Sequence, residues 1–85
     1  MKHYDPLAAP DATEWLSLDE TERLRLIRSY HAEARIEAPR IEVHAAIHAV
    51  VETQLAMGVP AVTSACTRLL AQGLDRHETI HAIAS

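Results

Sequence analysis

The chain has 85 residues, a net charge of −4 with histidine counted as neutral, and one cysteine. This length fits one domain with a small hydrophobic core and excludes a second large domain. The acidic balance argues against a general nucleic-acid binder and against a binder of anionic membranes. Cys66 alone makes no internal disulfide, which favours the reducing cytoplasm as the compartment.

Hydrophobic residues make up 48% of the chain, mostly as alanine, leucine, isoleucine and valine, and only two glycines are present. Such a composition predicts an all-α fold whose helices pack closely through small side chains. We expect three main helices plus a short C-terminal helix, joined by short loops in a bundle-like arrangement. All of them belong to one domain over residues 1–85.

The N-terminal residues 1–10 are predicted to be an extended lead-in, because Pro6 and Pro10 disfavour a helix before them. Asp11 is placed to cap a short turn. This turn carries Trp15, the only large aromatic side chain, which we expect to anchor it on the core.

The first long helix is predicted from Ser17 to about Ala34. Ser17 and Glu20 have the spacing of a capping box, in which each side chain accepts a backbone N–H of the other. His31 lies on the apolar stripe of this helix. We therefore expect His31 to be a core histidine with satisfied hydrogen bonds.

A second helix is predicted from Pro39 to Met57, with proline in its first turn and Gly58 after its end. Its histidines lie at the border of its apolar arc, a position that suits a partly buried ligand. The arc that we expect to face the core consists of Val43, Ile47, Val50, Val51 and Leu55.

The third helix is predicted from Pro60 to Gly73 and the fourth from Asp75 to Ser85. Asp75 and Glu78 have the spacing of a second capping box. The inward-facing residues are expected to be Val62, Ala65, Cys66, Leu69 and Leu70 in the third helix, and Ile80 and Ile83 in the fourth.

Charge is distributed unevenly, since residues 1–42 hold nine acidic and six basic residues whereas residues 43–85 hold three and two. The second set is too small to cover the outer surface of its helices. We therefore expect the apolar surface of residues 43–74 to be covered by a second copy in a homodimer, or by another protein.

Two histidine pairs carry the clearest chemical signal. His44 and His48 are four residues apart on the second helix, and His77 and His81 are four residues apart on the fourth. This spacing places both imidazoles of a pair on one helix face. Two facing pairs supply the four nitrogens of a closed, tetrahedral zinc site. Glu52, one turn beyond His48, and Glu78, beside His77, are candidates to orient the imidazoles or complete the shell.

Other interpretations use the same residues. Residues 77–81 match HExxH, the motif of zinc proteases, but no strand is expected nearby to hold a peptide substrate. A di-metal carboxylate site across a dimer is a second alternative, with Glu52 and the Glu78-x-x-His81 unit from each copy. In a third, the protein is an interaction module and its histidines are incidental. Enzyme activity is not expected, because the sequence shows no open coordination position and no cleft.

Three segments carry a resemblance to a known group of proteins. They are GLDRHETIHAIAS, the pattern His44-x3-His48-x3-Glu52, and EWLSLDETERLRLIRSYH. The chain resembles small, histidine-rich bacterial proteins that are grouped as a domain of unknown function. The resemblance implies that the six candidate residues match the family's histidine and glutamate positions, and it implies no reaction. Related chains continue past the last motif, so an incomplete final helix is expected at Ser85.

Overall fold

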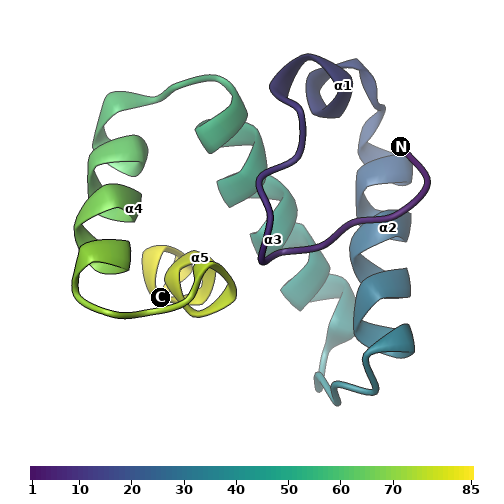
Figure 1. Ribbon diagram of the computed structural model, residues 1–85. Coiled ribbons are helices and arrows are strands. Elements are labelled where there is room, and N and C mark those ends of the chain that lie inside the picture. The colour runs from purple at the N-terminus through teal and green to yellow at the C-terminus, as the bar shows by residue number, and fades with distance from the viewer.

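The computed structural model describes residues 1–85 and confirms the all-α fold, with five helices and no strand (Figure 1). The fourth and fifth are the third main helix and the short C-terminal helix predicted from sequence. The helices are α1 (Ala12–Ser17), α2 (Glu20–Glu33), α3 (Ile41–Ala56), α4 (Pro60–Ala71) and α5 (Arg76–Ala84).

The predicted capping box at Ser17 is wrong, because Ser17 is the last residue of α1. The cap of α2 is Asp19, whose carboxylate accepts the N–H of Glu22 at 2.8 Å. Asp19 has the same spacing to the free N–H groups of the first turn that Asp11 has at the start of α1. The predicted turn is therefore a short helix, α1, with its own cap at Asp11, and the long helix α2 begins with a second cap at Asp19.

The loop between α2 and α3 contains two residues in the left-handed region, Arg35 at φ 56° and Arg40 at φ 58°. Arg40 is the N-cap of α3, so this helix begins at Ile41 and not at Pro39 as predicted. A left-handed residue interrupts the run of helical dihedrals. Pro39 therefore lies in the loop.

The apolar core lies where α1, α2 and α3 meet. Trp15 is fully buried, and its indole Nε1 donates to Thr53 Oγ1 at 3.2 Å. The residues that form the core are Tyr4, Trp15, Leu26, Ile27, Ala45 and Ala49. Because α3 offers alanines here, the helix backbone can approach its neighbours closely and leave room for the large rings.

The predicted inner face of α3 is therefore wrong at two of its five residues, while Ile47 and Leu55 are half-buried. Val51 is buried as expected, but Val43 and Val50 are 55% and 54% exposed, and the buried side carries Ala45, His48 and Ala49. This helix is apolar on nearly every side. The bulky rings of the N-terminal half pack best against its small residues, which leaves its larger aliphatic residues outside.

The helices α4 and α5 form the other half of the molecule. The Asp75–Glu78 capping box of α5 is present as predicted, and Ile80 is fully buried. In contrast, α4 has no buried residue, so its predicted inner face lies only partly covered. No single helix is long and apolar enough to cross a membrane; α3 and α4 reach that measure together, but the chain bends by 103° between them.

The extended lead-in crosses in front of α2 and α3 before it turns into α1 (Figure 1). Tyr4 and Pro6 in this segment are buried. Arg76 at the start of α5 donates to the Pro6 carbonyl oxygen at 2.9 Å. The lead-in therefore contacts both halves of the molecule and places the Tyr4 ring beside α3.

Candidate metal centre

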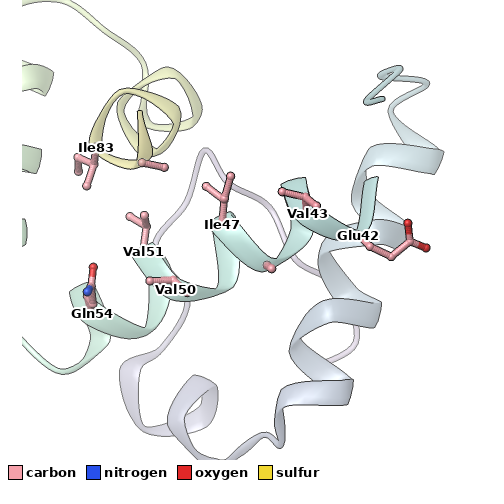
Figure 2. Close-up of a pocket in the computed structure, with 9 residues that line it drawn as sticks. Glu42, Val43, Ile47, Val50, Val51, Gln54 and Ile83 are labelled. Atoms are coloured by element: carbon pink, nitrogen blue, oxygen red, sulfur yellow. The ribbon is translucent and has the colours of Figure 1, made fainter. Parts of the chain in front are cut away.

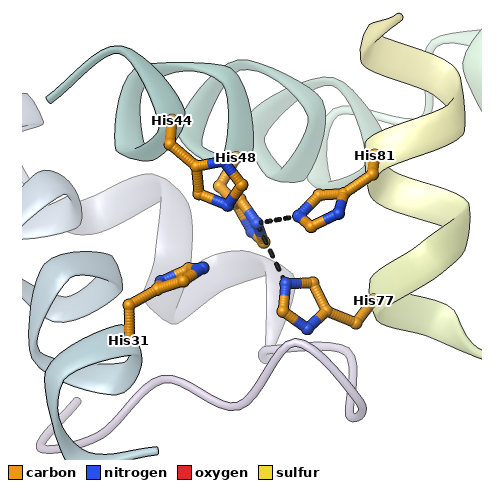
Figure 3. A group of neighbouring side chains, drawn as sticks. All are labelled: His31, His44, His48, His77 and His81. Atoms are coloured by element: carbon orange, nitrogen blue, oxygen red, sulfur yellow. Dashed lines mark hydrogen bonds between the residues drawn. The ribbon is translucent and has the colours of Figure 1, made fainter. Parts of the chain in front are cut away.

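Five histidines from three helices converge at a partly buried point between those helices (Figure 3). One ring nitrogen from each lies within 4.8 Å of those of all the others. The cluster consists of His31 from α2, His44 and His48 from α3, and His77 and His81 from α5. The two pairs singled out in the sequence thus face each other within one chain.

His31 is the member that the sequence prediction missed. It is buried, as expected, and its Nδ1 bonds the Ile27 carbonyl oxygen at 2.8 Å. Its Nε2, however, is buried and has no hydrogen-bond partner, so the expectation of a fully satisfied core histidine is wrong. Residue spacing did not indicate that His31 belongs to the cluster, because His31 has no second histidine one turn away on its own helix.

The partners of His31 and His48 fix which ring nitrogen carries the proton. A carbonyl oxygen only accepts, so Nδ1 of His31 is protonated and Nε2 holds a lone pair. The Tyr4 hydroxyl donates its single proton to Glu52 Oε2 at 2.5 Å. It therefore accepts from Nδ1–H of His48 at 3.1 Å, which leaves the Nε2 lone pair of His48 facing the cluster.

Glu52 determines the direction of these hydrogen bonds, because it accepts the one from the Tyr4 hydroxyl. Its carboxylate is buried and forms a two-point ion pair with Arg76, at 2.7 and 2.8 Å. The Arg76 guanidinium stabilises the Glu52 carboxylate, which accepts the hydrogen bond from the Tyr4 hydroxyl. Burial, followed by the charge of Glu52, raises the pKa of the Tyr4 phenol, so the hydroxyl keeps its proton. Glu52 thus lies behind His48, and the hydroxyl of Tyr4 connects the two.

Glu78 lies away from the imidazoles. Its Oε1 accepts the backbone N–H of Asp75 at 2.9 Å, and its side chain is exposed. Of the six residues proposed from sequence, the structure brings the four histidines together. It gives Glu52 an orienting position and leaves Glu78 in the cap of α5.

The remaining nitrogens crowd around His48. Its Nε2 is 2.9 Å from Nε2 of His81 and 3.2 Å from Nε2 of His77. Nε2 of His44 is buried without a partner. Burial, with neighbouring imidazoles as a second cause, lowers the pKa of His48 to about 2 and that of His77 to about 4. His48 and His77 are therefore uncharged at pH 7, and the buried Nε2 atoms of His31 and His44 are free to bind a ligand.

This arrangement has the properties of a ligand set for a transition metal. Imidazole nitrogen suits zinc, copper, nickel and iron, whereas magnesium and calcium prefer oxygen. No carboxylate lies among the five donors. Comparisons with protein-family models, curated proteins and solved structures found no match, so the geometry of the site is the basis for any functional assignment.

Proposed function

We propose that the protein binds a divalent transition metal, with zinc as the first candidate, through the imidazoles of the five-histidine cluster. The observation that carries the proposal is the convergence of five ring nitrogens within 4.8 Å of one another, of which Nε2 of His31 and Nε2 of His44 are buried without a hydrogen-bond partner. A buried lone pair without a donor is costly, and a metal cation satisfies several of them at once.

The contacts behind the ligands support the same proposal. Metal-binding histidines usually donate their other ring N–H to a carbonyl oxygen or a carboxylate. His31 does so directly, and His48 does so through the Tyr4 hydroxyl to Glu52. Five available imidazoles are more than the four protein ligands of a closed zinc site or the three of a site that keeps one position open, so the cluster supplies enough ligands for either.

The test is the metal content of tag-free protein, purified without chelators and measured by elemental mass spectrometry. We expect near-stoichiometric zinc, and loss of the metal in His48→Ala and in the His44/His81 double variant. His3→Ala is the matched control, since His3 is exposed and lies outside the cluster. Absence of bound metal after zinc is offered at neutral pH contradicts the proposal, and so does equal metal loss in His3→Ala.

A further inference from the structure

An apolar groove runs between α3 and α5 on the side of α3 that faces away from the core (Figure 2). Its volume is about 510 Å³, and seven of its nine lining residues are hydrophobic. Val43, Ile47 and Val50 form one wall, and Ile83 lies opposite. A groove of this size and composition suits the apolar part of a small molecule.

The groove reaches the edge of the histidine cluster. A second hollow, of about 150 Å³, is lined by His44 and His81. It shares Ile47 and Ala84 with the groove, so the two hollows are adjacent. His81 is the only exposed member of the cluster. A molecule lying in the groove therefore has its end beside the two histidines through which the site is accessible.

A divalent ion bound by the cluster would favour an anion at that end of the groove, whose lining contains one carboxylate, Glu42. Imidazoles that bind a metal contribute no charge, and a divalent ion adds two positive charges. Glu52 is the only carboxylate among the buried residues, and Arg76 already neutralises it. A buried cation with neutral ligands is stabilised by an added negative charge on its open side.

We infer that the groove and the metal form one binding site for a small amphipathic carboxylate. Its anionic head binds the metal beside His44 and His81, and its apolar chain lies between α3 and α5. This inference rests on the proposed metal site. An uncharged peptide would cover the groove without supplying a negative charge, and sedimentation distinguishes a second copy from the carboxylate.

The experiment uses the full chain loaded with Zn²⁺ or Co²⁺ and three probes: decanoate below its micelle concentration, acetate and decanol. Calorimetry measures binding, and the visible absorption of Co²⁺ reports a new ligand on the metal. We expect decanoate to bind the Zn²⁺ form at least about tenfold more tightly than it binds the metal-free form. We also expect decanoate to bind the Zn²⁺ form at least about tenfold more tightly than acetate or decanol does, and to change the Co²⁺ spectrum.

Two variants separate the groove from the metal. Val50→Asp places a charge inside the groove and is expected to weaken decanoate binding by about tenfold or more while the metal content stays unchanged. Met57→Asp adds the same charge at a position that is 65% exposed and lies outside the groove. It is expected to leave decanoate binding unchanged.

The outcomes that overturn the inference differ from those that overturn the metal proposal. A protein that takes up Co²⁺ but shows no spectral change with saturating decanoate overturns the inference alone. A loaded protein that sediments as a dimer, and that Val50→Asp converts to a monomer, assigns the groove to a second copy and overturns it too. A protein that takes up no metal overturns both.

Discussion

The helices α1, α2 and α3 are joined by buried hydrocarbon, whereas α5 is attached to α3 mainly by polar groups. Trp15, Leu26 and Ile27 fill the first interface. At the second, Ile80 is accompanied by the Glu52–Arg76 ion pair and by the histidines. Apolar packing depends little on pH or metal, while imidazoles respond to both. The two halves are therefore expected to fail under different conditions.

The largest expected effect is in the N-terminal half. Trp15→Ala removes a fully buried indole and is expected to lower the free energy of unfolding by about 3–5 kcal/mol. Urea denaturation followed by circular dichroism measures it. Trp15→Phe, which keeps a ring but loses the bond to Thr53, is expected to cost less. Equal losses in the two variants would contradict a role for the ring in packing.

The next effect tests the polar attachment of α5. Glu52→Gln leaves the Arg76 guanidinium without its charged partner and is expected to cost about 3 kcal/mol, because a partly buried charge is left unpaired. Hydrogen exchange is expected to rise mainly in α5. Glu20→Gln removes the exposed carboxylate that pairs with Arg23 at 3.5 Å and serves as the control, with little loss. Uniform acceleration across all helices would argue against separate attachment of α5.

A single hydroxyl, that of Tyr4, connects the lead-in to His48 and Glu52 on α3. Tyr4→Phe removes the acceptor of His48 Nδ1–H and the donor to Glu52. We expect metal affinity to fall by about 10–100-fold, measured by competition with a chelator of known affinity. Tyr30→Phe is the matched control, since the Tyr30 ring contacts His31 and His77 but its hydroxyl takes no part in this network. Equal affinity in both variants would mean that the Tyr4 hydroxyl does not orient His48.

The smallest expected effect is the loss of stability for each unit by which the pH is lowered. The pKa values of His48 and His77 are lowered in the folded chain to about 2 and about 4, mainly by burial. Below pH 6.5 these histidines bind more protons in the unfolded chain than in the folded one. Their contribution to the free energy of unfolding is therefore fully present above that pH and is lost as the pH decreases. His48 alone contributes a loss of about 1.4 kcal/mol per pH unit.

Thermal unfolding of metal-free protein between pH 7 and pH 5 measures this loss. The decrease is expected to begin in α5, and His48→Gln is expected to make the curve flatter. A metal-free protein whose melting temperature stays constant over this range would contradict the lowered pKa values of His48 and His77.

Features that depend only on the spacing of residues within one helix could be predicted from the sequence. The Asp75–Glu78 cap and the four paired histidines follow from local spacing, and each is where the sequence placed it. The buried side of α3 was not predictable. Both of its sides are apolar, so the choice depends on which one fits the rings of Tyr4 and Trp15. The role of His31 depends on the same choice, because α2 brings it to the cluster only when the alanine side of α3 faces inward.

The reach of the cluster along the chain has a consequence for the unfolded state. His31 and His81 lie more than half the chain apart, yet their nitrogens meet at one point. A metal held there closes long loops in a polypeptide whose one cysteine forms no cross-link. Bringing distant segments together costs an unfolded chain entropy, and a bound ion retains that constraint for as long as two ligands stay attached. Metal would thus act on this protein much as a reversible disulfide does on a small secreted domain.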